Sequence, residues 1–438
     1  MRRPARTLAA TLAVLSLSPL ATAVTHQELA EYWAPRIYHD TNDAYGYNAE
    51  YITRVDYDYD WIGTNNWENL PYYATPAHVY YNVVETSTHW FITYNAFHPR
   101  DDGPSGDQHE NDFEGGLLAV RKNGSTYGSL QVMETLAHDQ IYQYTNDAAI
   151  VGGSDNKDGP ILSVGGKPAV YIQANGFSGT GNGHGWKGWD GSGAPGGDGI
   201  VYYNGGLAEQ PSGGDGDWTR VYSYQLLPMS QLWDRRYNTQ PFAEWGALAG
   251  DNYGTNKAKM PWRWDDPDDG PVYDGAMWSD PALLLDTHLS GLGTFSRDYT
   301  VNDVANFKAT ITGAASLYNS DPFGGKSDIY VNVKIDGRQF WGEDQWKRND
   351  ATSGTTYSVV MGGANARFTG YDGSTSSIWI AKPITSTVTL EVWDSDTDGD
   401  DFMGSISFTC VAGQTVSGSG QSTSTGRAKL TYSVQCLR

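Results

Sequence analysis

Cysteine is nearly absent from this chain of 438 residues, which has only Cys410 and Cys436. So few thiols exclude a zinc site built from a cysteine cluster. In an oxidising compartment the two are expected to form one disulfide that ties down the C-terminus, and two unpaired thiols are the alternative.

Long apolar runs are also missing. No stretch approaches the roughly 20 consecutive apolar residues that a membrane-spanning helix needs. Residues 1–23 carry three arginines, a short apolar run and an A-x-A site ending at Ala23. This pattern predicts a secretory signal peptide. We therefore expect a soluble, secreted (extracellular) protein with no transmembrane segment.

Basic residues are scarce relative to acidic ones. The chain has 29 Lys and Arg against 51 Asp and Glu, a formal net charge of −22. Nucleic-acid binding needs a basic surface, so no nucleic-acid partner is expected. The same charge repels anionic membranes unless cations bridge the gap.

Helical apolar periodicity is rare, and short helices are expected only near residues 27–33, 230–236 and 241–249. Short alternating or β-branched runs, such as HWFITYNAF and IYVNVKI, are instead bounded by Gly, Asp, Asn and Pro. That texture is typical of antiparallel β-sandwiches. The predicted fold class is mostly β, with two β-sandwich domains and few short helices in the first. The expected parts are a signal peptide (1–23), a first domain (24–290), a connector (291–304) and a C-terminal domain (305–438).

One stretch of the first domain, DDGPSGDQHENDFEGG (101–116), crowds carboxylates around a single imidazole. In a strand starting near Asp112, side-chain alternation puts Asp112 and Glu114 on one face. His109 in the preceding turn, and Asp101 before a GPSG turn, could reach that face. Together these four side chains would suit a divalent cation such as Ca²⁺, Mg²⁺ or Mn²⁺, and the alternative is a solvated acidic loop.

Two acidic loops occur in the C-terminal domain, in LYNSDPFGGKSDIYVNVKI (317–335) and LEVWDSDTDGDDFMGSISF (390–408). Calcium prefers six to eight hard oxygen ligands, which such loops at one end of a sandwich supply. The order SDIYVNV followed by VWDSDTDGDDFMG resembles the calcium-binding C2 domain over roughly residues 305–438. The resemblance implies a Ca²⁺ site and calcium-dependent docking to phospholipid headgroups. The residues it implies as ligands are Asp321, Asp328, Asp394, Asp396 and Asp401.

The first domain has a resemblance of its own. FHPRD, ending at Asp101, and QHENDFEGG resemble the cation-binding core of the necrosis- and ethylene-inducing-like proteins. They are also similar to the vacuolar-protein-sorting-62-like group. The resemblance implies that Asp101, His109, Asp112 and Glu114 hold a divalent cation on a membrane-disrupting β-sandwich. Asn111 stands where that family has a second histidine, so membrane disruption does not follow from the match alone.

Three functions are compatible with these patterns. The favoured one is a secreted calcium-dependent membrane-interacting protein. Its C2-like domain would dock on phospholipid or glycolipid headgroups, and its first domain would engage a lipid or glycan headgroup through a cation and could disrupt the bilayer. A secreted metal-dependent hydrolase, a phosphoesterase or glycan hydrolase tethered by the C2-like domain, is the alternative. No G-x-S-x-G or H-E-x-x-H motif supports it. His184 in GNGHGWKG is its best candidate base, and the alternative for this residue is a solvated loop histidine. The third is a non-catalytic protein whose cations only brace the folds.

Overall fold

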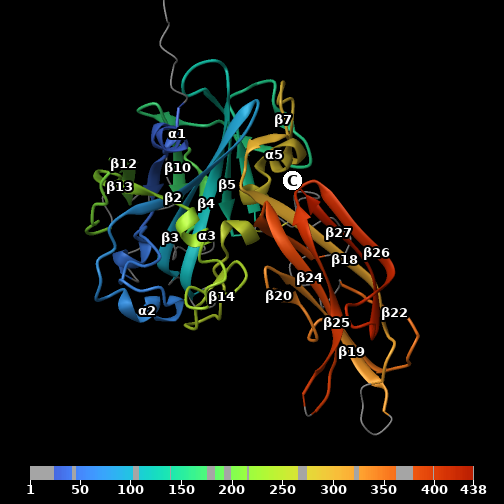
Figure 1. Ribbon diagram of the computed structural model, residues 1–438. Helices are drawn as coiled ribbons and strands as arrows, with labels where there is room; N and C mark the ends of the chain where they lie inside the picture. Colours follow the sequence, from blue (N-terminus) through green and yellow to red (C-terminus); the bar gives the residue numbers. More distant parts are fainter. Residues whose placement is uncertain are drawn as a thin grey trace, which may run out of the picture.

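The computed structural model describes residues 24–41, 46–101, 108–138, 140–174, 183–191, 199–214, 217–264, 274–319, 325–361, 378–397 and 399–437. The predicted signal peptide and Asp321 lie outside these residues. Strands dominate both the first region (residues 24–303) and the second region (residues 304–437), as Figure 1 shows. The prediction of a mostly β protein with few short helices is confirmed.

A single large sheet of 13 strands organises the first region. Its path runs β11 (Trp186–Gly188), β10 (Lys167–Ile172), β1 (Arg36–His39), β12 (Ile200–Asn204), β13 (Arg220–Pro228), β2 (His78–Thr86), β3 (His89–Asp101), β4 (His109–Arg121), β5 (Ser129–Ala137), β6 (Gln140–Tyr144) and β8 (Lys157–Gly159). β9 (Ser163–Val164) and β17 (Tyr299–Val301) pair off this path. Two small antiparallel pairs accompany it, the hairpin of β14 (Phe242–Glu244) with β15 (Ala247–Leu248), and the long-range pair of β7 (Val151–Gly152) with β16 (Leu289–Ser290).

Both faces of this sheet are buried. Along β3, Phe91 and Phe97 face one apolar cluster, whereas Ile92 and Tyr94 face the other. The sheet curls, so that its end strand β11 lies close to β5. The expected antiparallel pairing holds for β2 to β6, but β1–β10, β12–β13 and β13–β2 are parallel. These parallel pairs depart from the antiparallel arrangement predicted from the short alternating runs.

The helices are short. They are α1 (His26–Trp33), η1 (Tyr47–Glu50), η2 (Gly63–Asn65), α2 (Asn66–Asn69), α3 (Ser230–Trp233), η3 (Pro261–Arg263), α4 (Ala276–Ser279) and α5 (Pro281–His288). None in the described part of the chain is long and apolar enough to cross a membrane. The helix expected at 241–249 is wrong, because this segment forms β14 and β15 around Gly246, whose φ is 65°. An L side chain rarely adopts this left-handed conformation.

Two five-stranded sheets form the second region. One contains β22 (Tyr357–Ser358), β18 (Val304–Ser316), β27 (Ala428–Leu437), β26 (Gln414–Ser422) and β23 (Ile378–Pro383). The other contains β20 (Arg338–Trp341), β19 (Ser327–Ile335), β24 (Thr385–Asp394), β25 (Asp401–Val411) and β21 (Lys347–Ala351). Antiparallel pairing is observed throughout both sheets.

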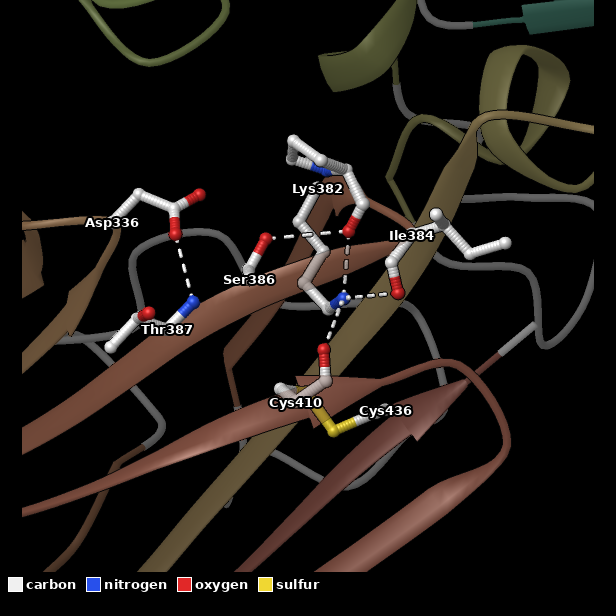
Figure 2. Close-up of a disulfide and its surroundings, with 8 residues drawn as sticks. Asp336, Lys382, Ile384, Ser386, Thr387, Cys410 and Cys436 are labelled. Atoms are coloured by element: carbon white, nitrogen blue, oxygen red, sulfur yellow. Dashed lines mark hydrogen bonds between the residues drawn. A yellow bond between two sulfur atoms is a disulfide. The ribbon is translucent and has the colours of Figure 1, made fainter.

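The predicted disulfide is confirmed, since Cys410 on β25 is bonded to Cys436 on β27 and so joins the two sheets (Figure 2). Beside it, the buried ammonium of Lys382 donates to the carbonyls of Pro383 (2.8 Å), Cys410 (3.3 Å) and Ile384 (3.4 Å). Burial lowers the pKa of Lys382 to about 8. The disulfide and this lysine both fix the end of the sandwich that adjoins the first region.

The two regions share apolar contacts. Phe340 on β20 packs against Trp245 and Tyr237, with ring centroids 5.3 and 6.4 Å apart. The Arg338 guanidinium donates to the Tyr237 carbonyl over 3.2 Å. The segment expected as a connector (291–304) is fixed to the sheet of the first region, because Tyr299 and Val301 in β17 pair with β2.

Candidate cation sites

The β3–β4 hairpin positions the four side chains that the sequence singled out in the first region. Asp101 ends β3 and is paired in register with His109, which begins β4. Strict alternation would put His109 and Asp112 on opposite faces of β4. Asn111 between them has a φ of 61° and interrupts that alternation. His109, Asp112 and Glu114 consequently line one pocket.

Asn111 is fixed in this conformation by three hydrogen bonds. Its amide nitrogen donates to the carbonyls of Gly63 (2.9 Å) and Ala249 (2.7 Å), and its amide oxygen accepts from Asn66 over 2.6 Å. Asparagine is among the residues that most readily adopt a left-handed backbone. The residue that departs from the resembled heptapeptide thus has a structural role at the site.

Asp101 and His109 form an ion pair, with 3.3 Å between Oδ2 and Nε2. Nδ1 of His109 lies 2.6 Å from the Asn111 carbonyl and donates to it. Burial alone would lower the pKa of His109, but the hydrogen bond to Asp101 and the charge of Asp112 raise it. Because a backbone carbonyl fixes Nδ1 as the protonated nitrogen, Nε2 is the atom that can bind a metal ion.

Asp112 is held in place by His184, which comes from a distant part of the chain. Its Oδ2 accepts from Nδ1 of His184 (2.9 Å) and from the His184 amide (3.2 Å), while Oδ1 accepts from the Phe113 amide (2.8 Å). Nε2 of His184 lies 3.2 Å from Oε2 of Glu50. Burial would raise the pKa of Asp112, but the hydrogen bond and charge of His184 lower it to about 2. His184 is fully buried, so the reading of a solvated loop histidine is wrong.

Two more buried histidines lie behind His184. The ring of His98 stacks on that of His184 with centroids 3.6 Å apart and planes 8° from parallel. Nε2 of His98 is 2.9 Å from Nε2 of His39, and Nδ1 of His39 donates to the Asp40 carbonyl over 2.5 Å. Burial, followed by the nearby charge of His184, lowers the pKa of His39 to about 3. His39 is therefore neutral, and its Nε2 accepts a hydrogen bond from Nε2 of His98.

His98, Asp112 and His184 offer ligand atoms within 4.8 Å of one another, a grouping that could hold a metal ion. Imidazole lone pairs lie in the plane of the ring, however, and these two rings are nearly parallel. One ion cannot lie in both planes unless a ring turns. The stacked arrangement instead suits a support for Asp112.

Glu114 has the least satisfied carboxylate of the group. It is 5% exposed, and its Oε1 accepts from the His138 amide over 2.9 Å. Its Oε2 is buried and has no hydrogen-bond partner. Burial and then the charge of Asp112 raise its pKa well above the ordinary value. A nearby cation would relieve both effects.

The carboxylates converge beside Gly183. A Cβ placed on Gly183 would lie 2.9 Å from Oδ2 of Asp101, 3.6 Å from Oδ2 of Asp112 and 3.1 Å from Cε1 of His138. The adjoining pocket has a volume of about 260 Å³ and is lined by His109, Asp112, Phe113, Glu114, Leu136, His138, Lys257, Ala258, Lys259 and Trp264. The site is thus a hollow with carboxylates at one side and access from solvent.

The acidic side chains of the second region gather where β19 begins and β24 and β25 meet. Asp394 is paired in register with Ile329 and with Asp401. Its Oδ1 accepts from the Asp328 amide over 2.5 Å, and Oδ1 of Asp328 accepts from the Asp350 amide over 2.8 Å. The two carboxylates are therefore neighbours at one end of the sandwich.

The loop after β24 adds a residue that the sequence analysis did not select. Asp400 accepts hydrogen bonds from the Asp396 amide (3.2 Å) and the Tyr330 hydroxyl (2.7 Å). The ammonium of Lys347 reaches the same loop and donates to Ser395 Oγ over 2.7 Å. Asp400 and Asp401 remain exposed.

Residues 306–424 match the family model of the C2 domain. The predicted resemblance is confirmed for this part of the chain. In the matched region Asp328, Asp394, Asp396 and Asp401 lie around one end of the sandwich, and Asp321 lies outside the described residues.

Solved structures similar to the chain include both predicted families. The structure of a C2 domain shares 13% identity, covers 31% of this chain and 99% of its own, with a TM-score of 0.22. Necrosis and Ethylene inducing Protein 2, from the causal agent of cocoa's witches' broom disease, shares 13% identity over 53% of this chain and 84% of its own, with a TM-score of 0.26. Human group IVD cytosolic phospholipase A2 shares 11% identity over 31% of this chain, which spans only 18% of that enzyme, with a TM-score of 0.22. No curated protein matches the sequence.

The structure brings Asp101, His109, Asp112 and Glu114 together, and His184 lies behind them rather than at the pocket surface. Sequence reasoning missed Glu50 and His138. Neither residue stands in a motif, and each reaches the site only through the fold.

Proposed function

We propose that this protein is a secreted, calcium-dependent membrane-interacting protein with one cation site in each region. The observation that carries the proposal is the match of residues 306–424 to the C2 domain, whose acidic end offers carboxylates to calcium. Calcium bound there would neutralise the loops and leave coordination positions for lipid phosphate oxygens. The net charge of −22 makes such a bridge necessary at an anionic membrane.

The donors of the first region fit a hard divalent cation. Asp101, Asp112 and Glu114 supply carboxylate oxygens, and His109 supplies Nε2. The buried Oε2 of Glu114, which has no hydrogen-bond partner, is the strongest sign that a cation belongs beside it. Oxygen-rich sites with one imidazole suit Ca²⁺, Mg²⁺ or Mn²⁺ better than zinc or copper. When bound, the ion would supply a positive charge with open positions for a lipid or glycan headgroup.

The placement of the two sites supports a common target surface. The first site adjoins α2, since the Trp67 amide on that helix donates to Glu110 beside His109. Figure 1 shows α2 at the lower end of the first region and the start of β19 at the lower end of the C2 domain. A membrane that engages both sites would meet the molecule at these two ends.

The extracellular space is the environment in which calcium-dependent membrane binding is expected to operate. The disulfide between Cys410 and Cys436 is stable in an oxidising compartment and rare in the cytosol. Calcium is also abundant outside cells, where calcium modules bind in the 10⁻⁴–10⁻³ M range, as an order of magnitude.

A tethered metal-dependent hydrolase is the second candidate, favoured by one observation. The pocket is open to solvent, and the His138 side chain is 47% exposed with Nδ1 4.0 Å from Oε1 of Glu114. A histidine at that place could act as a base toward a cation-bound water. Release of phosphate or sugar from model esters and glycosides, lost in His138→Gln, would favour this candidate.

The proposal is tested by sedimenting the full chain with dye-loaded phospholipid vesicles across a calcium titration. Calcium-dependent sedimentation, reversed by a chelator, is the expected result, and dye release would add membrane disruption to docking. Sedimentation without dye release would make the C2 domain a tether. Absence of binding at millimolar calcium would overturn the membrane proposal.

A further inference from the structure

The pocket of the first region has a basic wall opposite its carboxylates. Lys257 and Lys259 line the same hollow as His109, Asp112 and Glu114. The Lys257 side chain is exposed, and its ammonium makes one long hydrogen bond, 3.4 Å to the Gln108 carbonyl. Among the described residues it forms no ion pair, although the carboxylates of Asp112 and Glu114 line the same pocket.

The charge at this pocket bears on what it can bind. Asp101, Asp112 and Glu114 contribute three negative charges, and a divalent cation leaves one of them unbalanced. His184 and Glu50 behind Asp112 add opposite charges that offset each other. An anionic ligand would be repelled by this residual charge unless a further cation faced it. Lys257 supplies that charge at the pocket wall.

Phosphate is the ligand chemistry that uses both features at once. Its oxygens are the hard ligands that Mg²⁺ and Ca²⁺ prefer, so one oxygen can complete the coordination of the cation. Lysine binds phosphate as a compact point charge with three donors, and a second phosphate oxygen can face it. A neutral sugar hydroxyl would gain far less from a charged ammonium.

We infer that the pocket beside Asp112 and Glu114 binds a phosphate group, held between the bound divalent cation and the ammonium of Lys257. This inference rests on the proposed cation site and narrows its ligand from a lipid or glycan headgroup to one that carries phosphate. A phospholipid headgroup and a soluble phosphate ester share this chemistry. Lys257 is then the residue that selects for the anion, whereas the carboxylates select for the cation.

The test uses Mn²⁺ and glycerol phosphate with the full chain carrying Asp394→Asn, which weakens cation binding at the C2 domain. Mn²⁺ affinity is measured by calorimetry, and phosphate proximity by broadening of the ³¹P signal of glycerol phosphate. We expect Lys257→Gln to weaken glycerol phosphate binding about 10-fold while Mn²⁺ affinity stays within about 2-fold. Lys157→Gln is the matched control, because Lys157 is also exposed and also bonds one carbonyl, that of Ile150, over 3.4 Å.

The outcomes separate this inference from the function beneath it. Mn²⁺ binding without ³¹P broadening, or equal phosphate affinity in the Lys257 and Lys157 variants, would overturn the inference and leave the cation site standing. A folded protein without Mn²⁺ binding would overturn both. Phosphatidylcholine vesicles with and without phosphatidic acid identify the source. If phosphatidic acid increases vesicle binding and this increase depends on Lys257, the ligand is a lipid phosphate. If only glycerol phosphate binds in a Lys257-dependent way, the ligand is a soluble phosphate ester.

Discussion

The two candidate sites of this molecule handle negative charge in different ways. In the first region Asp112 and Asp101 have histidine partners at 2.9 and 3.3 Å. In the C2 domain Asp328 and Asp394 are braced by backbone amides, and Asp400 and Asp401 face solvent. The first site is preorganised by side chains, whereas the second depends on solvent or a cation to screen its charge. Similar acidic sequences can therefore build a rigid site, where histidines pair with the carboxylates, or an adaptable site, where the carboxylates face solvent.

Removal of one first-region carboxylate gives the largest expected effect. Asp112→Asn deletes a ligand charge and leaves the imidazolium of His184 facing an amide, so we expect about a 300-fold loss of Mn²⁺ affinity at this site. Calorimetry resolves the loss, with Asp286→Asn on α5 as an exposed control. Calcium-dependent vesicle binding through the C2 domain should persist. An unchanged Mn²⁺ affinity would show that the preorganised site is not a cation site.

The buried histidines make the stability of the first region depend on pH, whereas residues 304–438 contain no histidine. The folded-state pKa of His39 is lowered to about 3 from 6.5, chiefly by burial. The folded state therefore binds fewer protons than the unfolded state between these values. Its stability is complete above pH 6.5 and falls as pH drops toward 3, by about 3 kcal/mol at pH 4.5.

Thermal melts of wild type and His39→Gln at several pH values check this expectation. Glutamine can still accept from His98, so the fold should form, and the slope of melting temperature against pH below 6.5 should flatten. Parallel slopes in the two proteins would count against His39 as the source of acid sensitivity.

Weakening the adaptable site should have a smaller effect. Asp394→Asn removes one charge from a group of carboxylates that can partly replace one another, so we expect about a 30-fold rise in the calcium concentration needed for vesicle sedimentation. Mn²⁺ affinity in the first region should not change. If Asp394→Asn weakened both calcium-dependent sedimentation and Mn²⁺ binding in the first region, the two sites would be coupled.

A lysine inside the acidic end of the C2 domain gives the smallest expected change. Lys347 lies close enough to Asp328 and Asp400 for their charges to raise its pKa, after the larger effect of its hydrogen bond to Glu343. Its ammonium competes with calcium for these carboxylates. Lys347→Met should therefore raise apparent calcium affinity about 3-fold. Lys334→Met, which breaks an ion pair with Glu391 on the same domain, is the control and should leave calcium affinity unchanged.

Much of the fold could be predicted from local signals, and most errors arise where distant contacts decide the conformation. The helix expected at 27–33 is confirmed by α1 (His26–Trp33), and a capping box of Thr25 and Glu28 stabilises its start. Helix α5 was missed although Asp280 caps it and Pro281 opens it, a recognisable start signal. The segment 241–249 was assigned to a helix, but contacts of Phe242 and Trp245 with a distant aromatic cluster decide its conformation.

The candidate site divides in the same way. Asp101, His109, Asp112 and Glu114 lie on the paired strands β3 and β4, so their short separation and the family resemblance predict a common site. The left-handed backbone of Asn111, which brings His109 to the side of Asp112, could not be predicted. Glu50, His138 and His184 come from η1, the end of β5 and the segment before β11, and only the curled sheet brings them near. No pattern within a short stretch of sequence encodes that convergence, and the role of Asn111 depends on a backbone angle.

Hydrogen–deuterium exchange with and without calcium tests the contrast between the two sites most directly. The account predicts that amides of residues 394–401 gain strong protection when calcium binds, because the cation orders an adaptable acidic end. Amides of residues 109–114 should change little, since their side chains are already fixed by His184, Asn111 and His138. A large gain in amide protection at residues 109–114 when calcium binds, or unchanged protection at residues 394–401, would contradict the account.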